Sequence, residues 1–237
     1  MSALTEQAVQ FAGQVEELLR STVCATPPDL DLQERESEEG LAVVVRSSPS
    51  SPALLTVKSS PILRLDVSYR FRLGRDLGRL RVDSSSFQVW SMVQGPPLFR
   101  YDYLDSPRSQ KVPQAHVQVH AHRDELLHAM YVSDRSRSTP ARKKRLDPAE
   151  PRGLHMIHFP LGGARFRPCL EDVVELVVNE FGLDTQPDWQ ERVRDGRAQW
   201  RRVQLAAAVR DDPQTARRAL DGLGAEAPTD EERLGRI

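Results

Sequence analysis

The sequence lacks several features that would assign it to a common class. It has only two cysteines among 237 residues, Cys24 and Cys169, and neither belongs to a CxxC or comparable ligand spacing. This excludes a zinc ribbon and a disulfide framework, and it favours two ordinary buried thiols. No P-loop, GxGxxG fingerprint or GxSxG elbow occurs, so nucleotide hydrolysis and serine-hydrolase chemistry have no support.

Long hydrophobic runs and an excess of one charge sign are also missing. No run approaches the ~18 apolar residues of a membrane-spanning helix. The N-terminal segment MSALTEQAVQ has neither the basic start nor the apolar centre of a signal peptide. We therefore expect a cytoplasmic protein without membrane contact. The formal net charge of −1 excludes a globally basic nucleic-acid coat, although it leaves room for a local basic patch.

Charge is concentrated in two segments. Residues 29–39 hold six acids and one arginine, and residues 133–153 hold seven basic residues and three acids. Such runs are typical of solvated chain, but the first also suits a linker that faces a partner and the second a loop that faces phosphate. The candidate phosphate-binding residues are Arg142, Lys143, Lys144, Arg145 and, after a glycine pair, Arg165.

Hydrophobic periodicity predicts an α+β fold. Apolar residues spaced by three and four predict a helix over 3–23, and strict alternation predicts a strand over 62–73. Further strands are predicted over 80–93, 98–104, 115–121 and 154–161, and helices near Pro168, near Pro187 and after Pro213. Short turns between successive strands favour an antiparallel sheet of about five strands, with one helix before it and about three after it.

This pattern divides the chain into four parts. Residues 1–60 are interpreted as the N-terminal helix and an acidic, Pro- and Ser-rich linker with a short edge strand. Residues 61–181 form the antiparallel core, which carries the basic insertion 133–153. Residues 182–224 are a helical extension, and residues 225–237 are a flexible tail. The extension has a seam at helical spacing that suits packing on a protein partner, formed by Trp189, Val193, Trp200 and Val203.

All six histidines lie between His116 and His158. A strand over AHVQVHAH places His116, His120 and His122 on one face, opposite the apolar side chains. Same-face neighbours lie ~6.5–7 Å apart, so two imidazoles can flank one small ligand. His158, on the later predicted strand, is the third choice after His116 and His120. Histidines on the polar face of an exposed strand are also often plain surface residues.

Two chemistries fit these histidines. The first is metal-independent cleavage of RNA, in which one imidazole removes a proton and another delivers one. It needs no cofactor, and its predicted catalytic residues are His116, His120, Arg100, Asp102 and His158. The second is a transition metal such as zinc. Its candidate ligands are His116, His120 and His122, with Asp102 or Glu125 to complete the set.

The order of motifs over residues 62–181 resembles a known family. A YRFRL strand and a hairpin precede FRYDY, a proline and spaced histidines, and the matching positions are Arg100, Tyr101, Asp102, Pro113, His116 and His120. This resembles the TumE-like toxins of bacterial toxin–antitoxin systems, in which an RYD strand precedes a histidine-rich segment and a closing helix. The chain departs from them in its size, in the insertion 133–153 and in its separated histidines. The resemblance implies a toxin directed at RNA or translation, with a protein antitoxin as partner.

Three functions therefore stay open at the level of sequence. The first is an RNA-cleaving or toxin-like protein of a bacterial toxin–antitoxin or antiphage defence system. The second is a histidine-ligated metal-binding protein. The third is a non-catalytic interaction subunit of a defence or regulatory complex, which the helical seam and the acidic run favour.

Overall fold

The computed structural model describes an antiparallel sheet and four helices within residues 2–24, 28–37, 40–73, 78, 80–93, 95–105, 114–119 and 169–222. The strands are β1 (Leu30–Ser37), β2 (Gly40–Ser47), β3 (Ala53–Val57), β4 (Ser60–Leu73), β5 (Leu80–Ser91), β6 (Phe99–Leu104) and β7 (Ala115–Val119). The helices are α1 (Ala3–Thr22), α4 (Leu170–Phe181), α5 (Trp189–Asp211) and α6 (Pro213–Gly222). The α+β prediction is confirmed, with seven described strands where about five were expected.

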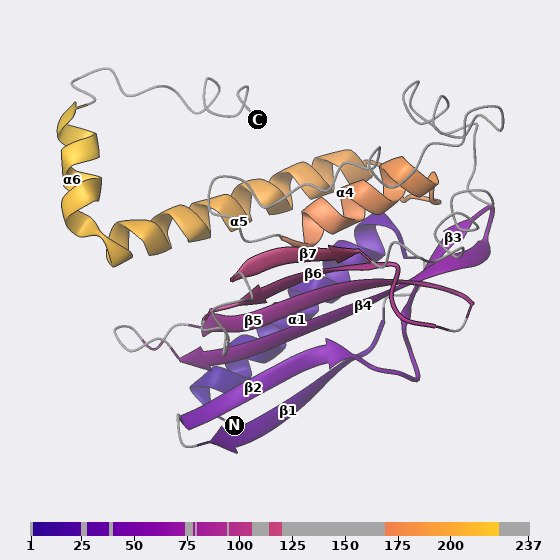
Figure 1. Ribbon diagram of the computed structural model, residues 1–237, viewed down its shortest axis with the longest axis horizontal. Helices are drawn as coiled ribbons and strands as arrows, with labels where there is room; N and C mark the ends of the chain where they lie inside the picture. The colour runs from indigo at the N-terminus through magenta and orange to yellow at the C-terminus, as the bar shows by residue number, and fades with distance from the viewer. Residues whose placement is uncertain are drawn as a thin grey trace. The chain divides into compact units, whose positions relative to one another are not determined.

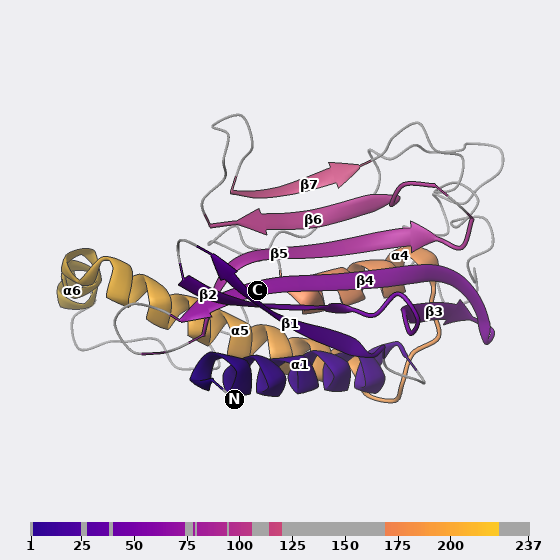
Figure 2. The ribbon, with the colours of Figure 1, turned by 90° about the horizontal axis from the view of Figure 1, so that it is seen from below.

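The strands lie in the order β1-β2-β4-β5-β6-β7, and β3 pairs with β4 (Figures 1 and 2). Every pairing is antiparallel. Along β4 the alternating residues Leu63, Leu65, Val67, Tyr69 and Phe71 are buried, as the period-two pattern predicts. Arginine, aspartate and serine side chains between them occupy the opposite face, so the sheet has one apolar and one polar face.

Helix α1 packs its apolar stripe on the apolar face of the sheet. Ser2 caps its first turn, because the Ser2 hydroxyl accepts a hydrogen bond of 3.2 Å from the backbone N–H of Thr5. Phe11 stacks edge-on against Tyr69 and Phe71, with ring centroids 4.8 and 4.9 Å apart. Aromatic pairs of this geometry add to the gain from burial alone, so Phe11 helps to fix α1 on the sheet.

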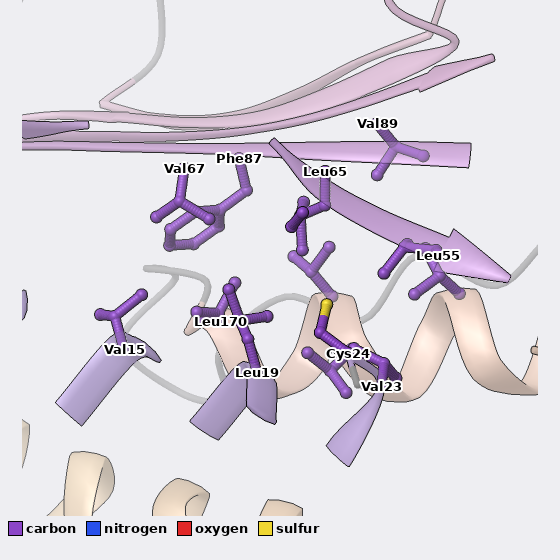
Figure 3. Packing of buried hydrophobic residues seen from close by; sticks show 14 of the residues in the cluster. Val15, Leu19, Val23, Cys24, Leu55, Leu65, Val67, Phe87, Val89 and Leu170 are labelled. Carbon is purple, nitrogen blue, oxygen red and sulfur yellow. The ribbon is translucent and has the colours of Figure 1, made fainter. Parts of the chain in front are cut away.

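Helix α4 covers the same face as α1. Figure 3 shows the side chains of Val67, Phe87 and Val89 pointing from the strands toward both helices, and Leu170 of α4 lies beside Leu19 of α1. Helices α1 and α4 both lie on the apolar face, and neither is packed on the polar face (Figure 1). The side chains on that face are therefore not covered by α1 or α4.

Residues 30–57 correct the interpretation of the N-terminal region as a linker with an edge strand. They contain three strands, and β1 pairs with β2 along its full length, from Leu30↔Ser47 to Ser37↔Gly40. The composition is misleading because β1 lies at the end of the strand order, where acidic side chains reach solvent while the backbone still pairs. Charge on such a strand also discourages edge-to-edge association with other chains.

The turn between β3 and β4 is held by a residue far away in the sequence. Lys58 and Ser59 have φ of 50° and 63°, a left-handed conformation that favours glycine or asparagine. The Asp184 carboxylate accepts hydrogen bonds from both of their backbone N–H groups, at 3.0 and 2.7 Å, and from the Thr56 hydroxyl at 2.8 Å. Asp184 thereby ties the segment after α4 to the sheet.

The chain divides into two units, Met1–Arg197 and Ala198–Ile237, and the division lies within α5. This differs from a helical extension that begins at residue 182. The start of α5 belongs to the first unit because Val193 is buried and Trp189 packs against the sheet core. At Gly196 a Cβ atom would lie 2.5 Å from Oε1 of Glu171, so glycine permits a close approach to α4.

The second unit contains the rest of α5 and the helix α6. Asp212 caps α6, because its carboxylate accepts a hydrogen bond of 2.9 Å from the backbone N–H of Thr215. No residue of α6 is buried. Among the described residues, no helix is long and apolar enough to cross a membrane. The predicted strand over 154–161, the basic insertion 133–153 and the tail 225–237 lie outside the described residues.

Candidate active site on the polar face

Strand alternation separates the members of the RYD motif. In β6, Arg100 and Asp102 lie on the polar face, whereas Tyr101 between them is fully buried among core residues. The Tyr101 ring packs edge-on against Phe99, with ring centroids 6.3 Å apart. Burial raises the pKa of the Tyr101 hydroxyl, and the nearby charge of Asp172 adds to this shift. Tyr101 is therefore a core residue, and only the flanking pair can take part in a polar site.

Asp102 is the centre of a cluster of polar side chains from three strands. Its Oδ1 accepts a hydrogen bond of 2.7 Å from the Ser86 hydroxyl. Its Oδ2 lies 2.8 Å from Nε of Arg100 and 3.6 Å from Nε2 of His116. The side chains of Asp102 and His116 are only 13% and 16% exposed. The carboxylate thus holds a hydroxyl, a guanidinium and an imidazole in one place.

The register of the sheet brings these residues together. Ser86 pairs with Asp102 across β5 and β6, and Asp102 pairs with His116 across β6 and β7. Directly paired residues have Cβ atoms ~4.5–5.5 Å apart, within reach for polar side chains. Gln88 adds a second layer, because its side-chain amide donates a hydrogen bond of 3.2 Å to the Ser86 hydroxyl. The cluster therefore rests on backbone pairing along three strands.

The arrangement suits proton transfer beside an anion. The His116 imidazole lies 3.6 Å from the Asp102 carboxylate, and histidine is the side chain that most often serves as a general acid or base. Arg100 presents a permanent positive charge next to the same carboxylate. Asp102 lies between Ser86 and His116, whereas in a serine-hydrolase triad the imidazole lies between hydroxyl and carboxylate. Ser86 is therefore placed to orient Asp102.

The other predicted site residues lie outside the described residues. These are the histidines His120, His122 and His158, the basic residues Arg142, Lys143, Lys144, Arg145 and Arg165, and the motif or ligand candidates Pro113 and Glu125. Of the predicted catalytic set, the structure thus brings together Arg100, Asp102 and His116. Within the described part of the chain, no group of three or more His, Cys, Asp or Glu side chains is arranged to hold a metal ion.

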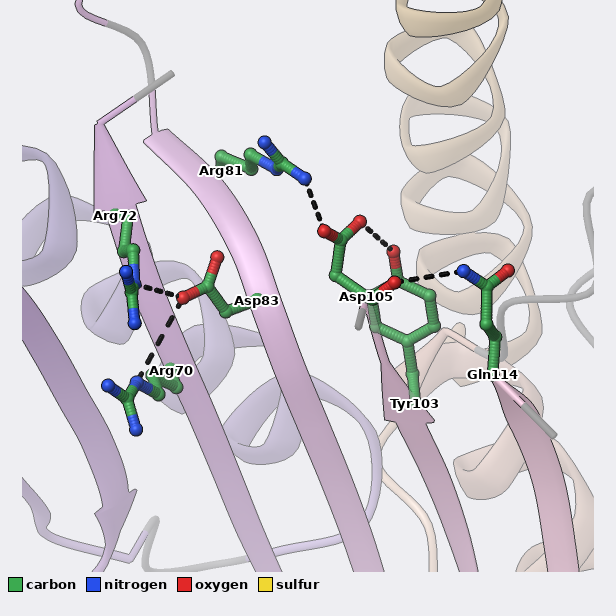
Figure 4. A network of polar contacts seen from close by, with 7 residues as sticks. All are labelled: Arg70, Arg72, Arg81, Asp83, Tyr103, Asp105 and Gln114. Carbon is green, nitrogen blue, oxygen red and sulfur yellow. Dashed lines mark hydrogen bonds and ion pairs between the residues drawn. The ribbon is translucent and has the colours of Figure 1, made fainter. Parts of the chain in front are cut away.

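A second polar network joins strands of the same sheet (Figure 4). Asp83 forms ion pairs with Arg72 and, at 3.9 Å, with Nε of Arg70. The Asp105 carboxylate pairs with Arg81 and accepts a hydrogen bond of 3.1 Å from the Tyr103 hydroxyl. Asp83 on β5 pairs with two arginines of β4, and Asp105, which follows β6, pairs with Arg81 of β5. We therefore assign this network to holding the strands together.

Sequence reasoning missed a hollow on the polar face of the sheet. It has a volume of about 340 Å³. It is lined by Arg46, Ser47, Pro49, Pro52, Arg64, Asp66, Val67, Ser68, Ser86 and Gln88. The alternation along β4 places Arg64, Asp66 and Ser68 on one face, but nothing local in the sequence indicates that Arg46 and the loop before β3 complete a concave surface.

The two cysteines are free and buried, as expected from their isolation in the sequence. Burial raises the pKa of the Cys24 thiol to about 12. The pKa of the Cys169 thiol is also raised, first by burial and then by the charge of Glu171. The Cys169 thiol donates to Oδ2 of Asp172 at 3.0 Å. Neither thiol has the lowered pKa of a reactive nucleophile.

No protein-family model, curated protein or solved structure matches the chain. The resemblance to TumE-like toxins therefore stays a prediction, carried by the motif order in the sequence.

Proposed function

We propose that the protein is a metal-independent, histidine-based ribonuclease, acting as the toxin-like component of a cytoplasmic bacterial toxin–antitoxin or defence system. The observation that carries the proposal is the Asp102 carboxylate between Arg100 and His116 on the polar face of the sheet. It combines an oriented imidazole with a cationic group, which are two of the three parts that phosphodiester cleavage by transesterification requires.

In this mechanism His116 removes the proton of the ribose 2′-hydroxyl. The 2′-oxygen attacks phosphorus, the bond from phosphorus to the 5′-oxygen breaks, and the leaving oxygen takes a proton from a general acid. The sequence-predicted candidates for that acid are His120 and His158. Arg100 stabilises the charge that develops on the phosphorane. The products are a 2′,3′-cyclic phosphate and a free 5′-hydroxyl, and atoms and charge balance without a metal or redox cofactor.

The test is cleavage of single-stranded RNA by purified protein in EDTA. We expect His116→Ala to lower the cleavage rate about 10²- to 10⁴-fold, the usual contribution of a general acid or base. Asp102→Asn should also lower it, because the neutral amide supports the imidazolium less well. Gln10→Ala is the control, since Gln10 is exposed on α1, away from the polar face of the sheet.

Cyclic-phosphate ends on the product would support transesterification. The proposal would be overturned by an inactive wild-type protein under these conditions. It would equally be overturned by a folded His116→Ala variant that cleaves RNA at the wild-type rate. Circular dichroism of each variant establishes that the fold is retained.

A second candidate function is a non-catalytic interaction subunit. It is favoured by four large apolar side chains that are exposed on the C-terminal part of α5 and on α6, namely Val203, Leu205, Val209 and Leu220. The proposed seam is only partly available for such a role, because Val193 is buried in the protein's own core. A wild-type protein that folds, fails to cleave RNA and binds a partner through these helices would have this function.

A further inference from the structure

The hollow on the polar face has the chemistry of a site for an anionic ligand with hydrogen-bonding groups. Among the described residues, two arginines, Arg46 and Arg64, line it together with one carboxylate, that of Asp66. Ser47, Ser68, Ser86 and Gln88 also line it, and the Ser47 hydroxyl accepts a hydrogen bond of 2.9 Å from the backbone N–H of Val67. Its volume of about 340 Å³ is at the small end of the range for ligand pockets, which suits a ligand of mononucleotide size.

Arg64 is held in place before any ligand binds. Its guanidinium carbon lies 4.7 Å from the centroid of the Trp90 ring, and its Nη2 lies 3.2 Å from Oδ2 of Asp66. A guanidinium fixed by stacking and by one ion pair loses little entropy when it binds an anion through its remaining N–H groups. Arg46, on the other wall, is exposed and adds a second positive charge.

The hollow adjoins the Asp102 cluster, because the two share Ser86. Ser86 lines the hollow and at the same time donates its hydrogen bond to Asp102. Paired residues run from Ser68 in the hollow through Ser86 and Asp102 to His116. With ~4.8 Å between neighbouring strands, this row covers about 14 Å. An extended strand of a few nucleotides is long enough to reach from one end of it to the other.

We propose that the hollow is a subsite for one nucleotide unit of a single-stranded RNA. The guanidinium groups of Arg46 and Arg64 bind its phosphate, and Asp66 and Gln88 hydrogen-bond to its ribose or base. That the bound nucleotide belongs to an RNA substrate rests on the proposed function. The capacity of the hollow to bind a phosphate-bearing nucleotide does not. The subsite determines substrate affinity, and the Arg100–Asp102–His116 cluster carries out the chemistry.

The first experiment measures binding of adenosine 5′-monophosphate, uridine 5′-monophosphate and adenosine to the full chain by calorimetry in EDTA. We expect both nucleotides to bind and adenosine to bind much more weakly. Arg64→Ala should weaken nucleotide binding by about tenfold to a hundredfold, the usual effect of losing a hydrogen-bonded ion pair. Arg35→Ala is the control, because it removes the same charge from an exposed position on β1.

The second experiment measures RNA cleavage kinetics of the same variants. We expect Arg46→Ala and Arg64→Ala to raise KM with little change in kcat, in contrast to the kcat loss of His116→Ala. Arg46 is exposed, so we expect Arg46→Ala to fold, and this variant tests the subsite even if Arg64→Ala does not fold. Binding of a short single-stranded RNA to the His116→Ala variant separates a subsite for polynucleotides from one for free nucleotides only.

The outcomes distinguish the two proposals. If Arg46→Ala and Arg64→Ala match Arg35→Ala in KM while RNA is cleaved, the subsite is refuted and the ribonuclease stands. If nucleotides bind through Arg46 and Arg64 but RNA is not cleaved, the ribonuclease is refuted and a nucleotide site stands. Absence of nucleotide and RNA binding in the wild-type protein would overturn the subsite outright.

Discussion

At the scale of single residues, neighbouring positions on one strand have unrelated roles. Arg100 and Asp102 belong to the polar cluster, whereas Tyr101 between them is enclosed by the core. A motif read as a consecutive unit, RYD, therefore contains two candidates for chemistry and one for packing. Alternation along a strand makes this division, and it predicts which of the three positions tolerates substitution.

Tyr101 provides a direct test of this division. Its buried hydroxyl has no hydrogen-bond partner among the described residues. Replacing tyrosine with phenylalanine removes this buried polar group and breaks no hydrogen bond among the described residues. We expect Tyr101→Phe to leave the free energy of unfolding unchanged or to raise it by up to about 1 kcal/mol, as measured by urea denaturation.

RNA cleavage by Tyr101→Phe should equal that of the wild type. A loss of activity in the folded Tyr101→Phe variant, comparable with that of Asp102→Asn, would show that the hydroxyl takes part in the reaction. Asp102→Asn is the informative comparison because it alters the adjacent residue on the opposite face of the same strand.

At the scale of helices and strands, the sequence predicts the elements whose apolar residues recur with a strong period. The stripe of α1 and the alternation of β4 are each decided by local spacing, and the structure confirms both. The acidic side chains of β1 indicate a linker, whereas its backbone pairs with β2 along the whole strand. Amino-acid composition indicates whether side chains are exposed to solvent, but not whether the backbone is paired. In a strand at the edge of a sheet the side chains can be exposed while the backbone is hydrogen-bonded to its neighbour.

The candidate site was likewise predictable only where local sequence patterns decide it. Alternation predicts that His116 lies on the polar face of its strand, and the order of the motifs predicts that Arg100 and Asp102 lie on a neighbouring strand. The division of Arg100 and Asp102 from Tyr101 came from the structure. The contribution of Ser86 depends on the register between β5 and β6, and the hollow depends on Arg46 approaching β4. No short segment of sequence encodes such non-local pairing. The role of Ser86 and the presence of the hollow could therefore be found only from the structure.

The turn between β3 and β4 leads to a prediction at this scale. Asp184 satisfies the backbone N–H groups of Lys58 and Ser59, which both have unfavourable positive φ. Asp184→Ala removes these charge-assisted hydrogen bonds. We expect it to lower the free energy of unfolding by about 1–3 kcal/mol, as measured by urea denaturation.

Asp195→Ala is the matched control for Asp184→Ala. Asp195 is exposed on α5, and its carboxylate lies 3.8 Å from Nε of Arg194 in an exposed ion pair. Exposed pairs contribute little, so this change should cost less than about 0.5 kcal/mol. Equal effects of the two substitutions would show that Asp184 does not hold the turn.

At the scale of the whole molecule, the division of the chain within α5 is testable with one pair of identical side chains. Val193, in the first unit, is 1% exposed, and Val203, in the second, is 51% exposed. We expect Val193→Ala to cost about 1–2.5 kcal/mol in the free energy of unfolding. Val203→Ala should change it by less than about 0.5 kcal/mol.

Both substitutions remove the same two methyl groups from the same helix, so differences in helix propensity cancel between them. The measurement is urea denaturation of the full chain followed by circular dichroism. A large loss of stability from Val203→Ala would mean that the protein buries this side chain, for example in a self-associated form. Repeating the experiment at several protein concentrations distinguishes self-association from folding.

The pairing of Asp102 with His116 has a consequence for how activity and folding are linked. A slip of one residue between β6 and β7 would move His116 to the apolar side of the sheet, because strand side chains alternate. It would also carry Val117 out of the core. Correct packing and a complete site therefore arise from the same choice of register. If the proposed function holds, a chain in which β6 and β7 have not yet paired in this register would lack activity, so RNA cleavage could begin only once this part of the sheet has formed.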